Sequence, residues 1–318
     1  MKRSIAIVAV LLAVATLAVS LRHRILVYGL ALEGPPDLLD AADEGPGVTW
    51  VDDYFTVHRL DARTFAIGEP RYAQQVYNYL IVGTERAVLF DAGPGLRDVR
   101  AVAESLTERP ITFIPSHFHY DHTGNEVTFD RVAVVDLPYL RERARDGRLR
   151  LTFEEHLGVA EGIAAPTLEV DEWLAPGADL ALGGRTLRVL YTPGHTEDSI
   201  SLLDLDSGDL FAGDFLYPGP LFAFLPNSGM GDYLAGAEAA LAAEPERVFG
   251  AHREAPPGVP ELALSDIRDL RRALEAIRNG GLEGEGIYPV VYPVNTRISL
   301  WAEPAWLQKW DPPDPSAR

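Results

Sequence analysis

The most informative stretch of the chain is Ser116-His117-Phe118-His119-Tyr120-Asp121-His122. Three histidines and an aspartate crowd into residues 117–122, directly after the apolar run Ile111–Ile114. Side chains alternate in an extended chain, so His117 and His119 face the same side. A turn after them would bring Asp121 and His122 to the same cavity from another direction. Imidazoles combined with a carboxylate suit Zn²⁺, so the stretch predicts a metal site at a strand end.

This stretch is also compatible with two simpler roles. A buried histidine is often only a hydrogen-bonded core residue, and a His-rich surface run can chelate metal adventitiously. Here an apolar strand precedes the run and the turn residues Thr123-Gly124-Asn125 follow it. Proteins of the α/β class place their sites where strands pass into loops. The position therefore favours a functional metal site.

The bulk composition narrows the class of protein and of partner. The chain has 318 residues, 47% of them hydrophobic and 24% charged, which fits a globular protein with a substantial core. Its net charge of −19 disfavours nucleic acid as a partner. The sequence holds no cysteine, so any metal must be held by His, Asp, Glu or backbone oxygen.

The N-terminus predicts a targeting or membrane segment. Lys2 and Arg3 precede an uncharged, apolar stretch over 4–21, and basic residues follow at 22–24. Such a stretch fits either a cleaved signal, with a small-residue cleavage site at Ala18-Val19-Ser20, or an uncleaved anchor. We therefore expect residues 1–24 to be a signal peptide or membrane anchor, residues 25–47 a linker, and residues 48–318 the catalytic domain. That domain would be exported, as a membrane-anchored extracytoplasmic domain or as a secreted or periplasmic protein.

The remaining sequence alternates strand and helix patterns. Apolar β-type runs occur at 55–60, 76–82, 87–90, 111–114, 132–135, 180–182, 187–190, 200–204, 210–212 and 287–300. Helical patterns occur at 96–106, 139–146, 231–243 and 261–278. This order indicates an α/β fold and is compatible with two sheets between helical layers, an αββα arrangement, although periodicity alone allows other α/β layouts.

The pattern His-x-His-x-Asp-His after an apolar strand resembles the metallo-β-lactamase superfamily. Four further segments resemble its other motifs in the expected order: Leu89-Phe90-Asp91-Ala92-Gly93, Tyr191-Thr192-Pro193-Gly194-His195-Thr196, Phe211-Ala212-Gly213-Asp214 and Val248-Phe249-Gly250-Ala251-His252. The resemblance covers about residues 48 to 255. It implies a four-layer αββα sandwich, here preceded by an N-terminal hydrophobic helix.

The resemblance also implies a ligand set for two divalent metal ions. His117, His119 and His195 would bind one ion. Asp121, His122 and His252 would bind the other, with Asp214 and a hydroxide bridging the pair. Zinc is favoured, and iron or manganese is allowed. Asp91 would orient a ligand imidazole from outside the coordination sphere, although an aspartate before Gly-Pro-Gly can also serve only the turn.

The implied chemistry is metal-dependent hydrolysis, and a small-molecule substrate is expected from that chemistry. A hydroxide formed at neutral pH would attack an ester, lactone or thioester carbonyl, with Asp121 able to accept a proton. The alternatives are a phosphodiesterase or β-lactam hydrolase on the same site, a mononuclear-iron oxidoreductase similar to persulfide dioxygenases, or a binding protein with a vestigial site.

Two features after Asp214 bear on the substrate. Tyr217 resembles a tyrosine that contacts the substrate carbonyl in acyl-homoserine lactonases, and it is therefore a candidate catalytic residue. It can equally be a loop tyrosine before Pro218-Gly219. The apolar segment Leu221–Leu225 can line an acyl pocket, form a core strand or face a membrane.

Overall fold

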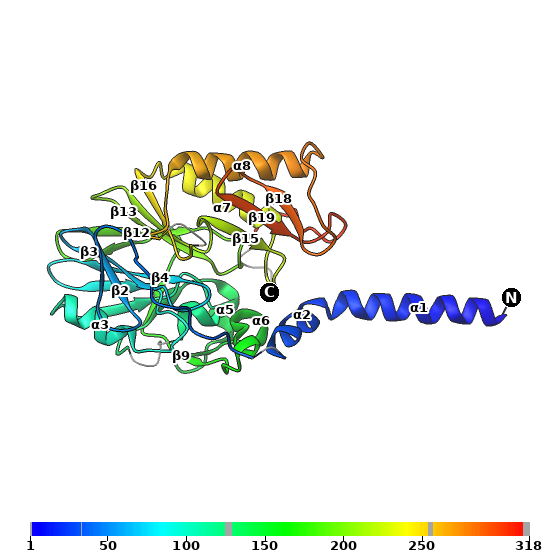
Figure 1. Cartoon of the computed structure of the whole chain (residues 1–318), viewed down its shortest axis with the longest axis horizontal. Coiled ribbons are helices and arrows are strands. Elements are labelled where there is room, and N and C mark those ends of the chain that lie inside the picture. The colour runs from blue at the N-terminus through cyan, green and yellow to red at the C-terminus, as the bar shows by residue number, and fades with distance from the viewer. Residues whose placement is uncertain (1, 33, 125–128, 254–256, 314–318) are drawn as a thin grey trace.

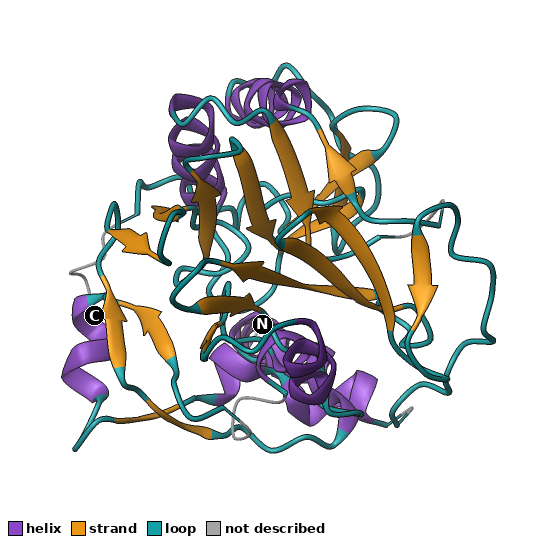
Figure 2. Ribbon diagram, turned by 90° about the vertical axis from the view of Figure 1, so that its left-hand side faces the viewer, coloured by secondary structure: helices purple, strands orange, loops and turns teal. Residues whose placement is uncertain are grey.

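The computed structural model describes residues 2–32, 34–124, 129–253 and 257–313. Two six-stranded sheets lie face to face, with helices on their outer sides (Figures 1 and 2). The prediction of an αββα sandwich is therefore confirmed.

The first sheet has the order β1-β2-β3-β4-β5-β6 and is antiparallel except for its last pair. Its strands are β1 (Val48–Trp50), β2 (Thr56–Asp61), β3 (Thr64–Glu69), β4 (Val76–Val82), β5 (Ala87–Phe90) and β6 (Ile111–Ile114). Every residue of β4 and β5 is buried, because both faces of this part of the sheet are covered.

The second sheet has the order β11-β12-β13-β14-β16-β17, and only β14 and β16 run parallel. Its strands are β11 (Asp179–Ala181), β12 (Thr186–Tyr191), β13 (Ile200–Asp204), β14 (Asp209–Gly213), β16 (Arg247–Gly250) and β17 (Glu261–Leu262). The two sheets meet through aromatic rings: Tyr79 of β4 lies 5.0 Å from Phe211 and 6.0 Å from Phe249, centroid to centroid.

Smaller sheets extend the sandwich at its edges. The parallel pair β15 (Gly219–Ala223) and β19 (Ile298–Ala302) is completed by β18 (Val290–Pro293). The other small pairs join β7 (Ala133–Val135) with β10 (Glu172–Leu174), and β8 (Arg148–Arg150) with β9 (Thr167–Glu169). The apolar segment after Asp214 is thus partly a strand, since its residues 221–223 belong to β15.

The helices form the outer layers. They are α3 (Val99–Leu106), α4 (Tyr120–Thr123), α5 (Pro138–Arg143), α6 (Phe153–His156), the 3₁₀ helix η2 (Gly158–Glu161), α7 (Met230–Ala242) and α8 (Leu264–Arg278). A second core cluster packs α7 and α8 onto the second sheet, through residues such as Tyr233, Leu270 and Val248. In Figure 1 these two helices lie above the sheets, and α3, α5 and α6 lie below them.

Three predicted helices are shorter than expected. The α3 helix begins at Val99 because the Asp98 carboxylate caps the amides of Arg100 and Ala101. The helix expected to reach residue 146 ends at Arg143, since Asp146 and Gly147 turn the chain with positive φ.

The third is α8, which begins at Leu264 rather than at 261. Glu261 and Leu262 pair with β16 instead, and the Asp266 carboxylate accepts a hydrogen bond from the amide of Ala263 at 2.8 Å.

Two N-terminal helices, α1 (Lys2–Ser20) and α2 (Arg22–Ala31), precede the sandwich, and α1 projects away from it (Figure 1). Within the described residues, no single helix is long and apolar enough to cross a bilayer; Val10–Ser20 and Arg22–Ala31 meet the criterion only as a pair bent by 65°. Val27, which falls in the predicted linker, belongs to α2 and is buried against the domain.

Candidate metal centre

The seven predicted ligands lie at one edge of the sandwich, each just beyond a strand. His117 and His119 follow β6, and α4 presents the next two ligands one turn later. The second sheet supplies the other three from the β12–β13 loop, the end of β14 and the end of β16. All seven side chains are at least nine-tenths buried, and the structure brings together in one cluster residues that span 117–252.

Three histidines form the first cluster. His119 Nδ1 lies 2.9 Å from His117 Nε2 and 3.0 Å from His195 Nε2. Tetrahedral coordination at about 2.0–2.1 Å per bond needs ligand nitrogens about 3.3 Å apart. The three nitrogens are therefore spaced for a single cation, with small adjustments of the rings.

A second cluster joins Asp121, His122 and His252. The Asp121 Oδ2 atom lies 3.7 Å from His122 Nε2 and 3.4 Å from His252 Nε2. The donor set of two imidazoles and a carboxylate again suits a borderline divalent cation such as Zn²⁺.

Asp214 stands between the two clusters. Its Oδ2 lies 3.4 Å from His195 Nε2, whereas its Oδ1 lies 3.3 Å from His122 Nε2 and 3.1 Å from His252 Nε2. Each carboxylate oxygen therefore faces a different cluster. This is the geometry that a bridging carboxylate requires.

Hydrogen bonds outside the clusters fix which imidazole nitrogens are free to bind. The Nδ1 atoms of His252 and His195 lie 2.9 Å and 3.2 Å from the carbonyl oxygens of Gln74 and Phe222. A carbonyl only accepts, so each Nδ1 carries the proton and each Nε2 presents a lone pair to the site. His117 Nδ1 contacts Ser116 Oγ at 3.0 Å, and this hydroxyl can either donate or accept.

Asp91 serves His122 and the ligand loop together. Its Oδ2 lies 3.0 Å from His122 Nδ1, and its Oδ1 accepts the amide proton of Ser116 at 2.7 Å. The residue is fully buried and adopts a left-handed φ of 68°, a conformation that a non-glycine residue seldom takes. That strain fits a residue held in place for the site.

The pKa shifts of the ligand histidines favour the binding of cations. Burial lowers the pKa of His117, His119 and His195, which keeps them neutral and able to bind metal. Burial also acts to lower the pKa of His122 and His252, but nearby carboxylates outweigh it and raise both. The buried carboxylates of the cluster therefore stabilise positive charge next to them.

Two buried polar atoms at the centre lack hydrogen-bond partners among the described residues. They are His122 Nε2 and Asp214 Oδ1. Buried polar atoms without partners are costly, and a cation between them would satisfy both. The residues present thus fit divalent metal at this place.

Tyr217 packs beside the site. Its ring stands edge-on to His252 with centroids 5.2 Å apart, and its hydroxyl donates to the carbonyl of Pro220. The expected contact between this tyrosine and a substrate carbonyl stays a prediction.

Two buried acids that no sequence motif marks support the ligand loops. Asp198 Oδ2 accepts the amide proton of Phe118, between His117 and His119, at 3.0 Å. Burial, with Glu155 and Glu197 nearby, raises the pKa of Asp198 to about 8. In sequence it is only an acid in a turn, so no local signal identifies it.

Glu69, at the end of β3, supports the turn that carries Asp91. Its carboxylate accepts hydrogen bonds from Tyr54 at 2.8 Å and Asn78 at 3.0 Å, and burial raises its pKa to about 7. A Cβ placed on Gly93 would fall 1.8 Å from its Oε1, so the turn rests directly on this side chain.

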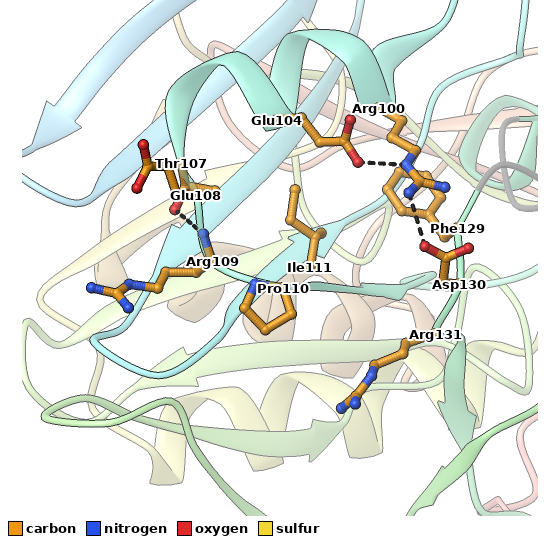
Figure 3. A pocket seen from close by; sticks show the side chains of 10 residues that line it. All are labelled: Arg100, Glu104, Thr107, Glu108, Arg109, Pro110, Ile111, Phe129, Asp130 and Arg131. Atoms are coloured by element: carbon orange, nitrogen blue, oxygen red, sulfur yellow. Dashed lines mark hydrogen bonds and ion pairs between the residues drawn. The ribbon is translucent and has the colours of Figure 1, made fainter.

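A separate surface depression of about 500 Å³ lies where β6 begins (Figure 3). The metal ligands His117 and His119 lie beyond the other end of that strand. Arg100 there pairs with Glu104 at 2.7 Å and Asp130 at 2.9 Å. None of its lining residues is a predicted ligand, so it takes no part in the site.

Comparisons with known proteins identify the family. A sequence model of the metallo-beta-lactamase superfamily matches residues 71–252, more than half of the chain. Acyl-coenzyme A thioesterase MBLAC2 of Bos taurus is 32% identical over 184 residues, which cover 50% of this chain and 65% of that protein. Hydroxyacylglutathione hydrolase of Anaeromyxobacter dehalogenans (strain 2CP-C) is 32% identical over 148 residues, covering 46% of this chain and 48% of that enzyme. The chain thus spans less than two thirds of the length of either relative.

Solved structures share the fold. A metallo-beta-lactamase from Pontibacter korlensis superposes with a TM-score of 0.52 at 17% identity, covering 70% of this chain and 99% of that one. The family match over residues 71–252 includes all seven predicted ligands, and the chain belongs to the metallo-beta-lactamase superfamily.

Proposed function

We propose that this protein is a hydrolase that uses two divalent metal ions, with zinc favoured, to cleave a carboxylic thioester or a related ester or lactone. The placement of Asp214 carries the proposal, because its two oxygens face two separate sets of imidazoles at 3.1–3.4 Å. A single metal would leave one of those sets without a cation. A dinuclear centre uses both.

Bound divalent cations would lower the pKa of water toward neutrality and polarise the carbonyl under attack. The protein's own groups would do the rest. Asp121 turns Oδ2 toward His122 and His252, which leaves Oδ1 to accept a proton from the attacking water. Asp91 lies 3.0 Å from His122 Nδ1 and would hold that ring in one orientation. The buried walls exclude bulk water, which strengthens each charge interaction in the site.

The names of two relatives support a thioester over the other carbonyl substrates. The named relatives include an acyl-coenzyme A thioesterase and a hydroxyacylglutathione hydrolase, both 32% identical over their matched residues. The absence of cysteine excludes a cysteine nucleophile for any of these substrates, and water activated by bound metal would take that role.

The test combines metal analysis with a substrate panel on the full chain. We expect about two zinc ions per chain and hydrolysis of acyl thioesters ahead of lactones, phosphodiesters and β-lactams. One iron ion per chain and no hydrolysis would point to the oxidoreductase alternative. Absence of bound metal after incubation with zinc would overturn the proposal.

We also propose that residues 1–24 direct the catalytic domain across or onto a membrane. The support is the apolar composition of residues 4–21 between basic residues. A mature mass beginning near Leu21 would identify a cleaved signal, and full-length chain in the membrane fraction would identify an anchor. Full-length chain in the soluble fraction would contradict both.

A further inference from the structure

Arg253 follows the ligand His252 in the sequence, and its side chain is buried. Each nitrogen of its guanidinium has a partner within the protein. Nε donates to the side-chain oxygen of Gln75 at 2.7 Å, Nη1 donates to the carbonyl of Gly258 at 3.2 Å, and Nη2 pairs with the Glu44 carboxylate. Because these nitrogens are engaged, Arg253 serves to hold protein segments together rather than to bind a substrate.

One of the segments that Arg253 holds carries the partner of His252. The carbonyl of Gln74 accepts the Nδ1 proton of His252 at 2.9 Å, and the side-chain amide of Gln74 donates to the Tyr120 hydroxyl at 2.7 Å. Tyr120 lies between two ligands of the first half in the sequence. The next residue, Gln75, adopts a left-handed φ of 48°, so contacts with neighbours must keep it there. Gln74 therefore links His252 to the ligand segment of the first half.

Glu44 belongs to the segment 25–47, which the sequence alone predicts to be a linker. Its carboxylate is buried in the domain, where it pairs with Arg253. The same segment is tied to the residue before the 72–75 loop, because the Leu39 amide donates to the carbonyl of Arg71 at 2.7 Å and Arg71 Nε donates back to the Leu39 carbonyl at 2.8 Å. A buried ion pair is costly to break, since one charge is left uncompensated. The segment before β1 is thus fastened to both sides of this loop.

We propose that Glu44 and Arg253 are positioning residues of the metal centre. The Glu44 carboxylate fixes the Arg253 guanidinium, which holds Gln75, and the adjacent Gln74 carbonyl then orients the His252 ring. The segment before β1 is therefore part of the support of the second ligand half. The proposal rests on the proposed two-metal centre and assigns two further residues to it.

The metal test compares the full chain with its Glu44→Gln variant, titrated with zinc against a chelating indicator. The variant keeps the shape of the side chain and removes the charge that Arg253 faces. One of the two ions should bind about tenfold more weakly and the other with unchanged affinity, because only the ligand set that contains His252 is loosened. In the cobalt-substituted chain, one visible absorption band should require about tenfold more cobalt, and the other should be unchanged.

Glu154→Gln is the matched control. It removes the exposed pair of Glu154 with Arg24 at 2.9 Å, which is another contact between the N-terminal segment and the domain. Both ions should bind to this variant as they bind to the native chain. Equal weakening in Glu154→Gln and Glu44→Gln would overturn the assignment of Glu44.

A double variant separates positioning from charge balance. Arg253→Met alone leaves the buried Glu44 carboxylate unpaired and can unfold the chain for that reason, so it is made together with Glu44→Gln. If the pair only balanced its own charges, the double variant would bind both ions with native affinity. Positioning predicts that one ion stays weakened at least as much as in Glu44→Gln, and recovery of native affinity would overturn it.

Hydrogen exchange of the metal-free chain tests the same contacts without metal or activity. The amide of Tyr77 donates to the carbonyl of Ala251 at 2.8 Å, so its exchange reports how firmly the loop and the ligand strand stay together. Peptides over 72–77 should exchange about fivefold faster or more in Glu44→Gln, whereas peptides over β13 should not change. Unchanged exchange together with unchanged zinc affinity would overturn the positioning role. Faster exchange in a protein that binds one ion and hydrolyses no thioester would refute the proposed function and leave the positioning role standing.

Discussion

The two halves of the sandwich build the same metal centre in different ways. The first half supplies four ligands from the continuous segment 117–122, whereas the second half supplies three from separate strand ends at 195, 214 and 252. In the first half, local sequence alone brings donors together. In the second half, only the strand order β12-β13-β14-β16 brings them together.

This difference determines how the ligand positions are set in each half. The dense segment is close-packed, with His117 Nε2 and His119 Nδ1 2.9 Å apart. The dispersed ligands sit on neighbouring strands, so their spacing is set by the sheet. Asp214 joins the halves, because its Oδ1 meets His122 of the first and His252 of the second.

The largest effect should come from removing a ligand from either half. We expect His119→Ala and His252→Ala each to lower kcat/KM about a thousandfold or more, because cation stabilisation is worth several kcal/mol. Metal content by elemental analysis should fall in both. His58→Ala is the matched control, since His58 lies on β2, outside the ligand clusters, and should retain metal and activity. If either ligand variant kept its full metal content, the half that supplies that ligand would not be needed to hold metal.

A smaller effect should come from the close contact between the two halves at Gly213 and Ser116. Gly213, with φ 53°, precedes Asp214, and a Cβ on it would lie 2.5 Å from the Cβ of Ser116. Gly213→Ala should therefore lower the free energy of unfolding by about 2–5 kcal/mol, from backbone strain and overpacking together.

The control for that substitution separates the two causes. Gly280→Ala meets a similar φ of 69° with nothing within 4 Å, so it should cost only about 1–2 kcal/mol of strain. Urea denaturation measures both variants. Equal costs would mean that crowding against Ser116 contributes nothing.

The contrast between the halves also explains what the sequence could predict. The segment 116–122 identified a metal site without help, because four donors crowd into one stretch. His195, Asp214 and His252 look like ordinary turn residues when taken singly, and the family resemblance was needed to join them. Asp198 and Glu69 had no signal at all, since each acts through a backbone contact made far away in sequence.

Element boundaries show the same limit. The strands 76–82, 87–90 and 111–114 were predicted with the observed bounds, because apolar runs between turn residues mark them. The ends of α5 and α8 were missed because a left-handed turn at Asp146 and the pairing of β17 with β16 set them. Such choices depend on neighbours that a single stretch of sequence does not reveal.

Asp91 allows a test of how the dense segment is held. Asp91→Asn keeps the shape but removes the charge that faces His122 Nδ1 at 3.0 Å. We expect kcat/KM to fall about 10- to 100-fold, the usual cost of losing the partner of a metal-binding histidine. Asp179→Asn, at an exposed surface pair with Arg188, is the control and should change nothing measurable. If both variants behaved alike, Asp91 would serve only the turn.

The smallest effect should be a pH dependence of stability that arises from Asp198, an acid of the second half that contacts the first. Burial raises the pKa of Asp198 to about 8, so the folded protein holds a proton there that the unfolded chain releases near pH 4. Its contribution to stability is therefore complete below that lower pKa and is lost as the pH rises through about 8. Asp198→Asn retains an oxygen for the Phe118 amide and cannot ionise, so its Tm should gain a few degrees over the native chain between pH 6 and 9. Thermal melts across that range measure the difference, and parallel curves would mean that Asp198 does not titrate there.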